Sequence, residues 1–412
     1  MDEILASAES RIQSHRAAKV TLRFAAPDGR PLPRTEVQIE LTRHAFKLGV
    51  SGFLIHSIAD PDLQQRCEDR FVALFNYATL PFYWGSYESA PGCTDAERLE
   101  RMADWCAQRG ILTKGHPLIW HEVFPKWADA LADEAVLSRL QARVRDIVAR
   151  FREHITIWDV VNEATVSSTA DNAIGRWMVQ NGPVACTAQA LNWARTANPS
   201  ATLLYNDFNI SPAFEQLCAD LLERGAAVDA IGIQSHMHKG VWPVAKSWLV
   251  CETYARFGRP LHFTEVTILS GPLKAADDND WFSTRPDWHS TARGEADQLD
   301  QGSKFYTTLF SHPAVEAITW WDLSDFSSWQ GAPAGLLRRD MTPKPLYDWL
   351  RDAFYGRWTT RARLVADEAG QVTLRAFFGD YQVSARTSSG DVLHGRFSLQ
   401  RSGPREISLT LA

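Results

Sequence analysis

The 412-residue sequence has little of what several classes of protein require. Its six cysteines stand singly, without a CxxC motif or a short His–Cys pairing, which argues against a disulfide scaffold or a zinc site. Lysine and arginine total 43 against 49 acidic residues, so the net charge of −6 shows no basic excess for nucleic-acid binding. No run of about 20 apolar residues is present to span a membrane. We therefore expect no metal site, no nucleic-acid partner and no membrane partner.

The N-terminal segment, MDEILASAESRIQSHR, is acidic and helical in pattern. It lacks the basic start and apolar core of a secretory signal. The sequence leaves two locations open: the cytoplasm, or secretion with a leader already removed. We expect the cysteines to be reduced and mostly buried. The sequence indicates no oligomeric state.

Tryptophan is what the sequence has in excess, with 16 residues against 9 tyrosines and 5 methionines. Indole side chains can fill a core, or they can form flat apolar platforms on which the rings of a ligand stack. Composition leaves both interpretations open. The positions of the tryptophans must decide between them.

Both ends of the chain are patterned as short β-strands. Residues 19–43 alternate apolar and polar side chains around a Pro-Asp-Gly turn, which predicts strand, turn and strand. Residues 356–412 contain further strand-like runs split by Gly, Asp and Ser. A two-stranded hairpin is marginally stable alone. We therefore expect the N-terminal hairpin, within residues 1–44, to join the C-terminal strands in one small accessory β-sandwich.

Between these ends, residues 45–355 alternate short apolar runs with helical patterns. The runs lie at residues 47–53, 77–82, 111–120, 155–163, 201–209, 229–238, 260–268 and 316–325. Apolar strands that alternate with helices indicate a parallel sheet, and eight such units predict an α/β fold of the closed (β/α)8 TIM-barrel type. A doubly wound open sheet is the alternative, but no GxGxxG or Walker loop follows any run. A long connection from Leu269 to Gly302 carries Trp281 and Trp288 and is expected to be functional.

Polar side chains end several strands of the predicted barrel, which is where barrels of this type build their active sites. The fourth run ends in Asn162 and Glu163, and the seventh carries Glu265 near its end. The two glutamates are expected to face one cavity from opposite sides. Glycoside hydrolysis needs such a pair, one carboxyl to protonate the leaving oxygen and one to attack the anomeric carbon or activate water. The alternative is that both are structural carboxylates at the barrel rim.

Six segments, in their order along the chain, resemble glycoside hydrolase family 10, whose typical members are endo-β-1,4-xylanases. The segments are KGHPLIWHE (114–122), WDVVNEA (158–164), LLYNDFN (203–209), GIQSHMH (232–238), HFTEV (262–266) and GLLRRDMTPKPLYDWL (335–350). The resemblance covers roughly residues 45–355, the whole predicted barrel. It implies a retaining hydrolase that cleaves β-1,4-xylosidic linkages in xylan or xylo-oligosaccharides through a covalent glycosyl-enzyme, without a cofactor.

The resemblance also implies roles for individual residues. Glu163 is implied as the general acid/base and Glu265 as the nucleophile, with their carboxyls ~5–5.5 Å apart, the separation that retention requires. Burial and the charge of Glu265 are expected to raise the pKa of Glu163. The residues expected to bind or orient the substrate are Asn162, His116, Trp120, Asn206, Gln234, His236, Trp321 and Trp329. Asn162 is expected to bind the 2-hydroxyl of the sugar.

The segment FNYATLPFYWGSYES (75–89) departs from the family pattern. Pro81 and Phe82 stand where a Glu-Asn pair is typical, and Gly85 stands where a Lys is typical. Polar groups are thus replaced by apolar, ring-rich surface, and we expect Trp84 to belong to the substrate-binding set there. Lost hydrogen bonds change selectivity more than chemistry. The sugar at the glycone subsites, and endo or exo action, stay open.

Two more departures concern single positions. Thr267 stands two residues after the predicted nucleophile, where the family often has an Asp, and Asp322 directly follows Trp321, where a Gly is usual. Two other functions remain as hypotheses. One is a retaining β-glycosidase of the same fold that acts on another β-linked or decorated saccharide. The other is a carbohydrate-binding protein without turnover.

Overall fold

The computed structural model describes residues 2–387 and 390–412, which fall into two compact units. The barrel unit comprises Leu48–Gly302 and Ala314–Tyr347. The sandwich unit comprises Met1–Lys47, Ser303–Pro313 and Asp348–Ala412. This division differs from the expected three-part division mainly in placing residues 303–313 with the terminal segments.

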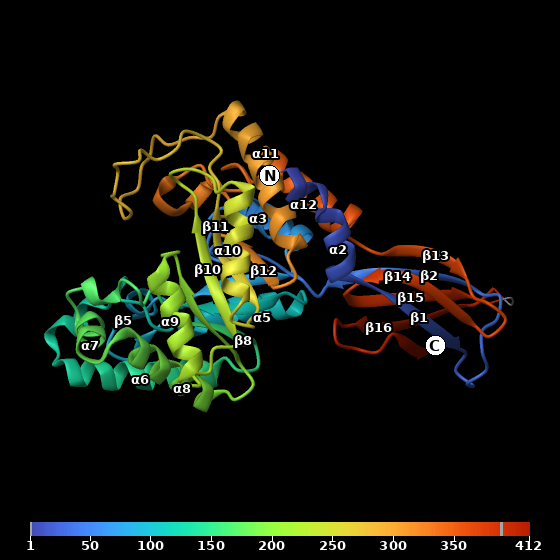
Figure 1. Cartoon of the computed structure of the whole chain (residues 1–412), viewed down its shortest axis with the longest axis horizontal. Coiled ribbons are helices and arrows are strands. Elements are labelled where there is room, and N and C mark those ends of the chain that lie inside the picture. Colours follow the sequence, from blue (N-terminus) through green and yellow to red (C-terminus); the bar gives the residue numbers. More distant parts are fainter. Residues whose placement is uncertain (1, 388–389) are drawn as a thin grey trace. The chain divides into compact units, whose positions relative to one another are not determined.

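Eight parallel strands close into a barrel (Figure 1). In their order around the barrel they are β3 (Lys47–Ser51), β4 (Tyr77–Pro81), β7 (Leu112–His116), β8 (Ile155–Asn162), β9 (Thr202–Asp207), β10 (Ala230–His236), β11 (Leu261–Thr267) and β12 (Val315–Trp320). Each strand lies within, or within one residue of, one of the eight apolar runs. The predicted (β/α)8 barrel is therefore confirmed.

Helices follow most of the strands along the chain. They are α3 (Pro61–Leu74), α4 (Trp84–Tyr87), α5 (Ala96–Gln108), α6 (Asp133–Arg150), α7 (Ala173–Asn181), α8 (Pro183–Ala197), α9 (Pro212–Glu223), α10 (Val244–Ala255), α11 (Ala292–Ser311) and α12 (Pro345–Asp352). Local chemistry fixes the start of α3: the Asp60 carboxylate accepts from the N–H groups of Asp62 and Leu63, and Pro61 is the first helical residue. No helix in the described ranges combines the length and apolar character needed to cross a membrane.

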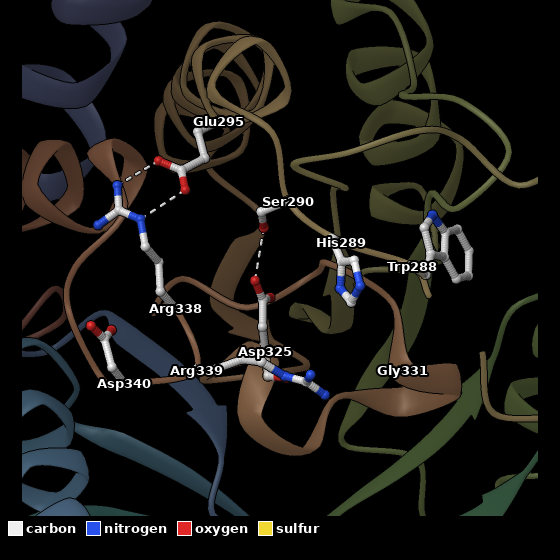
Figure 2. A pocket seen from close by; sticks show the side chains of 9 residues that line it. All are labelled: Trp288, His289, Ser290, Glu295, Asp325, Gly331, Arg338, Arg339 and Asp340. Atoms are coloured by element: carbon white, nitrogen blue, oxygen red, sulfur yellow. Dashed lines mark hydrogen bonds and ion pairs between the residues drawn. The ribbon is translucent and has the colours of Figure 1, made fainter. Parts of the chain in front are cut away.

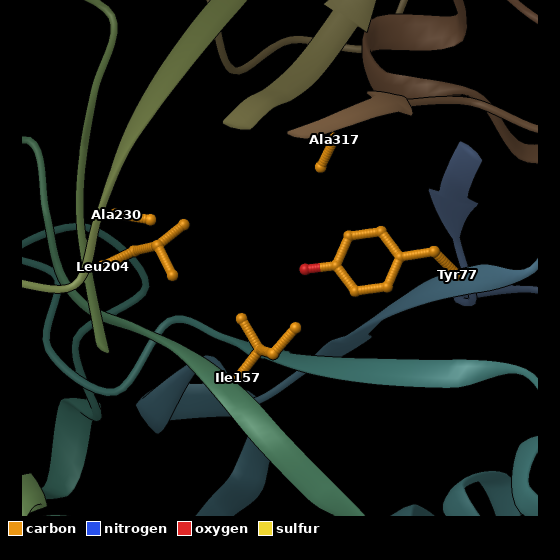
Figure 3. Packing of buried hydrophobic residues seen from close by; sticks show 5 residues of the cluster. All are labelled: Tyr77, Ile157, Leu204, Ala230 and Ala317. Atoms are coloured by element: carbon orange, nitrogen blue, oxygen red, sulfur yellow. The ribbon is translucent and has the colours of Figure 1, made fainter. Parts of the chain in front are cut away.

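An apolar cluster fills the barrel near the amino-terminal ends of its strands. Tyr77, Ile157, Leu204, Ala230 and Ala317, from five strands, are buried and point toward one another (Figure 3). The polar side chains that follow on the same strands lie nearer their carboxyl ends. The cluster thus gives the site a closed apolar floor and leaves the opposite end of the barrel for chemistry.

The sandwich unit contains two sheets, with the strand orders β14-β1-β17 and β13-β2-β15-β16. Their strands are β1 (Ala17–Ala25), β2 (Glu36–His44), β13 (Arg361–Val365), β14 (Gln371–Phe377), β15 (Gly379–Arg386), β16 (Val392–Leu399) and β17 (Glu406–Thr410). The same unit contains α1 (Asp2–Ala6), α2 (Ala8–Arg16) and a π-helical turn at Ala353–Arg357. The strands from both ends of the chain therefore do form a common β-structure, as expected.

The N-terminal hairpin needs correction. β1 pairs with β14 and β17, whereas β2 pairs with β13 and β15, so the two strands belong to different sheets. The segment between them contains Pro31 and Pro33, which have no N–H to donate to a hairpin ladder. It is long enough to carry the chain from one sheet to the other.

Five of the six cysteines are buried, and Cys93 is exposed.

Candidate active site

The two predicted glutamates are joined by one hydrogen-bond network at the carboxyl ends of β8, β9 and β11. Asn162, the last residue of β8, donates from Nδ2 to Glu163 Oε1 over 3.0 Å. Asn206 on β9 donates from Nδ2 to Asn162 Oδ1 (2.6 Å) and to Glu265 Oε1 (2.8 Å). The Thr264 hydroxyl in turn donates to Asn206 Oδ1 over 2.6 Å. The structure thus brings together the two glutamates, which are 102 positions apart in the sequence.

Glu163 is surrounded by neutral donors. Its Oε1 accepts from the amides of Asn162 (3.0 Å) and Gln234 (2.9 Å), and its Oε2 accepts from the Trp120 indole N–H (2.9 Å). Burial is the main reason why the pKa of Glu163 rises to about 8; the Glu265 charge adds to it, while the Gln234 and Trp120 hydrogen bonds oppose it. Glu163 therefore carries a proton at neutral pH.

The backbone of Glu163 is unusual as well. Its φ of +59° lies in the left-handed region, which a residue with a side chain seldom adopts. Its N–H donates to the Asn206 carbonyl (2.8 Å), and its carbonyl accepts from the Ser167 hydroxyl (2.8 Å). These bonds hold a conformation that costs free energy, and such strain is concentrated at functional sites.

Glu265 has one neutral amide donor and lies beside two histidines. Its Oε1 accepts from Asn206, and its Oε2 lies 3.0 Å from His236 Nε2. His116 Nε2 lies 3.9 Å from Glu265 Oε1. Burial tends to raise the pKa of Glu265, but His116, His236 and the charge of Lys114 outweigh it and lower the pKa below its usual range. Glu265 is therefore ionised at neutral pH.

Sequence reasoning missed the charged group beneath Glu265. Lys114 Nζ lies 2.5 Å from Asp159 Oδ2, and His116 Nδ1 lies 2.8 Å from the same oxygen, with all three side chains buried. Burial tends to raise the pKa of Asp159, but Lys114 and His116 together outweigh burial and lower the pKa below its usual value. Asp159 is therefore ionised. The sequence did contain a signal, because Lys114 and Asp159 lie inside apolar strand-like runs. Charged side chains in such strands are seldom fully buried unless they are paired.

The substrate-binding assignment of Trp84 needs correction. Its indole is buried against Phe124 and Trp127, with ring centroids 5.6 and 6.0 Å away, and its Nε1 donates to Glu88 Oε2 over 2.8 Å. Phe82 is buried as well, packed on Phe151. Trp84 begins α4, and both side chains pack inside the protein, Phe82 on Phe151 and Trp84 on Phe124 and Trp127.

Tyr83, which lies between them, is the side chain that reaches the site. Its ring centroid is 5.5 Å from that of His116 and 5.6 Å from that of Trp120. Burial, followed by the charges of Glu265 and Glu163, raises the pKa of the Tyr83 hydroxyl well above its usual value. Tyr83 thus places an un-ionised phenol among the carboxylates.

Gly85 has a steric reason to replace the longer residue typical of the family. Its N–H donates to the Val123 carbonyl over 2.7 Å. A Cβ at this position would lie 2.6 Å from that oxygen, closer than such contacts tolerate. The approach of residues 123–124 therefore excludes any side chain at Gly85.

Two of the tryptophans expected to bind substrate lie beside the two histidines. Trp321 lies 5.4 Å from His116 and 5.7 Å from His236 between ring centroids, and Trp329 lies 4.6 Å from His236. Trp281, from the long connection after β11, stacks on Trp329 at 5.9 Å. The predicted functional loop thus contributes a ring beside the site.

The two remaining departures from the family pattern have local partners. Thr267 Oγ1 lies 3.0 Å from His236 Nδ1, on the ring edge away from Glu265. Asp322 accepts from the Trp329 N–H over 2.9 Å, and burial raises its pKa to about 7. Asp322 thus holds the backbone that carries Trp329.

Among the described residues, no group of three or more His, Cys, Asp or Glu side chains is arranged to hold a metal ion.

A (β/α)8 barrel with one protonated and one ionised glutamate at linked strand ends has the form of a glycoside hydrolase. The sequence profile of glycosyl hydrolase family 10 matches residues 80–353, about two thirds of the chain. The chain belongs to glycosyl hydrolase family 10 and is a glycoside hydrolase.

The chain is similar to several individual proteins. Endo-1,4-beta-xylanase B of Thermotoga neapolitana is 29% identical over 272 residues, 62% of this chain and 73% of the relative. Anti-sigma-I factor RsgI6 of Acetivibrio thermocellus is 23% identical over 385 residues, 92% of this chain and 46% of the relative. The solved structure of xylanase 10B from Thermotoga petrophila in complex with xylobiose matches with a TM-score of 0.63 and 23% identity, over 76% of this chain and 95% of that one. At this identity the structural likeness establishes the fold.

Proposed function

We propose that the protein is a retaining hydrolase of β-1,4-xylosidic linkages that acts on xylan or xylo-oligosaccharides. The observation that carries the proposal is the contrast between Glu163, with its pKa raised to about 8, and Glu265, with its pKa lowered. At neutral pH one carboxyl can give a proton while the other can attack. Two carboxyls in these states are what a double displacement needs.

In the first step, a Glu265 oxygen bonds to the anomeric carbon as the glycosidic C–O bond breaks. Glu163 transfers its proton to the departing oxygen, so the leaving sugar departs as an alcohol. The product of this step is a glycosyl ester on Glu265. His116 and His236 favour the ionised form of Glu265 before the attack, because both lower its pKa, His236 in part through its hydrogen bond to the carboxylate.

In the second step, Glu163 acts as a base. Glu265 has lost its charge in the ester, so one of the causes that raise the pKa of Glu163 is absent. Glu163 then takes a proton from water as the water oxygen bonds to the anomeric carbon and the ester bond breaks. Two inversions at one carbon give net retention, and both carboxyls return to their starting states.

The amides between the carboxyls fit a role in orienting the sugar. Asn162 is held by Asn206 (2.6 Å) and by Gln234 (3.2 Å), both donating to its Oδ1. A fixed amide beside both carboxyls suits a hydrogen bond to the sugar 2-hydroxyl, which strengthens in the transition state. Trp120, Trp321 and Trp329 offer rings against which sugar C–H groups can pack.

The substrate class is supported by the relatives, several of which are named as endo-1,4-beta-xylanases, and one matching structure holds xylobiose. A second candidate is a retaining β-glycosidase for another β-linked or decorated saccharide. Tyr83 is the observation that favours it. A phenol among rings offers a different surface from the polar pair and lysine typical of the family, and so a different sugar.

Product analysis decides between these candidates. The wild-type protein is incubated with matched xylo-, gluco- and manno-oligosaccharides, and products and initial anomers are followed by NMR. Turnover of xylo-oligosaccharides with β-anomers formed first supports the proposal. Turnover of another series alone supports the second candidate, and α-anomers formed first would exclude retention.

A further inference from the structure

A pocket of about 350 Å³ opens in the barrel unit apart from the two glutamates (Figure 2). Its lining residues come from the long connection after β11, the start of α11 and the segments after β12: Trp288, His289, Ser290, Glu295, Asp325, Gly331, Arg338, Arg339 and Asp340. Small-ligand sites occupy about 300–1,000 Å³. The pocket is therefore large enough for a small ligand, and its chemistry identifies which kind.

The two inner carboxylates of the pocket are already neutralised. Glu295 forms a two-point ion pair with Arg338, at 2.9 and 2.6 Å, drawn as dashed lines in Figure 2. Asp325 accepts from the Ser290 hydroxyl (2.8 Å) and pairs with the buried Lys344 at 2.7 Å. These pairs are local and well connected, so the pocket is formed in advance of any ligand.

Asp340, at the outer edge of the pocket, is also engaged. One of its oxygens accepts from both the N–H (3.0 Å) and the hydroxyl (2.6 Å) of Thr342. These bonds to Thr342 are the main reason why the pKa of Asp340 is lowered. Its carboxylate is thus tied to its own turn.

Arg339 is the cation of the pocket that remains available. Its Nε donates to the Asp325 carbonyl over 3.2 Å, which orients the guanidinium. Within residues 2–387 and 390–412, Arg339 has no ion-pair partner. A guanidinium presents a planar fork of donors that fits a carboxylate at two points. His289, which is exposed, lines the same pocket.

An aromatic wall joins this pocket to the catalytic region. The Trp288 indole is fixed by a bond from its Nε1 to the Pro272 carbonyl (2.7 Å), and its ring centroid lies 6.1 Å from that of His238. His238 lies 5.8 Å from His236, which contacts the nucleophile. Because His238 is buried, these ring contacts connect the pocket to the catalytic region through the interior of the barrel unit.

Gly331 allows the two loops of the pocket to meet. It has a φ of +69°, and a Cβ there would lie 2.7 Å from the Arg285 carbonyl oxygen. Gly331 follows Trp329 by two residues, so the same turn that carries a ring of the catalytic site also borders the pocket. The two sites share one structural element.

We propose that this pocket binds a carboxylate-bearing sugar branch of the polysaccharide substrate, with Arg339 on the carboxylate and Trp288 against the apolar face of the sugar ring. A bare inorganic anion would use the guanidinium without the ring surface, whereas a uronic acid uses both. The inference rests on the proposed function, since it places the branch on a chain held at Glu163 and Glu265. It makes the enzyme selective for acidic polysaccharides.

The first test compares two polymers that differ in one group. Xylan with uronic acid branches is compared with the same xylan after chemical reduction of its carboxyls to primary alcohols, using the full-length protein. We expect kcat/KM to be higher for the acidic polymer, and Arg339→Gln to lower that preference about two- to fivefold, the value of a partly exposed ion pair. Salt should reduce the preference as well. An equal kcat/KM on both polymers, or an unchanged preference in Arg339→Gln, overturns the proposal.

A matched variant controls for net charge. Arg293 lies in the same region of the chain, is exposed, pairs with Asp297 at 3.0 Å and is not among the pocket residues. Arg293→Gln removes the same charge and should leave the preference as in the wild type. A loss of preference in Arg293→Gln equal to that in Arg339→Gln would mean that the overall charge, and not the pocket, selects the polymer.

Binding without turnover separates this proposal from the proposed function. Affinity electrophoresis measures retardation of the wild type and Arg339→Gln in gels that contain either polymer. Suppose that neither polymer is cleaved, but that the acidic polymer retards the wild type more than it retards Arg339→Gln. The proposed binding in the pocket is then supported, and the proposed function fails. Competition with sodium glucuronate and with inorganic phosphate then identifies the ligand chemistry. Displacement by glucuronate at lower concentration supports a sugar site, and equal displacement by phosphate overturns it.

Discussion

Glu163 and Glu265 are buried to a similar extent, at 9% and 4% exposed, but their pKa values move in opposite directions. The difference lies in the charge of their partners. Neutral amide and indole groups surround Glu163, whereas two imidazoles and a buried lysine charge surround Glu265. Burial alone would raise the pKa of both carboxyls. The comparison teaches that the groups beside each carboxyl, rather than burial, set its protonation state, in the way that the proposed acid and nucleophile require.

The strongest way to break the comparison is to remove the ionised member. Glu265→Ala should lower kcat on the natural substrate by on the order of 10⁴-fold or more, because the attacking group is lost. The fold should remain intact, which circular dichroism and thermal unfolding check. Rates like those of the wild type would show that another group attacks.

Removal of the proton donor should have a smaller and more selective effect. Glu163→Gln should slow the natural substrate by roughly 10²- to 10⁴-fold. Aryl glycosides with good leaving groups should lose less in the first step, because their departure needs little protonation. In the wild type, kcat/KM should fall as pH rises through about 8, where Glu163 loses its proton, and Glu163→Gln should lack this fall. An equal loss on both types of substrate would argue against an acid role.

The charge beneath Glu265 can be tested through Lys114→Met. The substitution leaves Asp159 buried with less compensation, and breaking a buried pair costs about 3–5 kcal/mol of the free energy of unfolding. Because Lys114 lowers the pKa of Glu265, the acidic limb of kcat/KM should also move to higher pH. Urea unfolding and pH–rate profiles measure the two effects.

Lys344→Met is the matched control for that variant. Lys344 is equally buried and pairs with Asp325 at 2.7 Å. Its loss should destabilise the protein in a similar way and leave the acidic limb in place. If both variants move the acidic limb equally, loss of stability rather than charge sets the pH profile.

The smallest effect concerns two neighbouring aromatic residues. Tyr83→Phe removes one hydroxyl from the site and should raise KM a few-fold, the worth of about 1 kcal/mol of hydrogen bonding. Trp84→Phe should leave KM unchanged and lower stability instead, because Trp84 packs on Phe124 and donates to Glu88. The reverse pattern would restore Trp84 as the substrate-binding residue. Steady-state kinetics and thermal unfolding on both variants decide this.

The sequence predicted the barrel and its two glutamates because each depends on local pattern. Apolar runs gave the eight strands, and residues at strand ends necessarily meet at one end of a barrel. The contribution of Tyr83 was not predictable in the same way. Which of three consecutive aromatic residues faces the site depends on where β4 ends, and on the approach of the Val123 carbonyl to Gly85.

Non-local pairing was also out of reach of the sequence. β1 and β2 flank a turn-like segment, yet each finds its partners among strands more than 300 residues away. The Arg339 pocket depends on three segments that only the folded chain brings together. In each case the missing information is tertiary, because the local pattern is compatible with more than one partner.

The most direct test of the account is a pH titration of the two carboxyl groups in the free enzyme. ¹³C NMR of labelled glutamate side chains, assigned with Glu163→Gln and Glu265→Gln, follows each carboxyl across the pH range. The account predicts that Glu163 titrates near pH 8 and Glu265 below its usual range. It also predicts a lower pKa of Glu163 in Glu265→Gln. Titration of both carboxyls near the ordinary value for glutamate would contradict it.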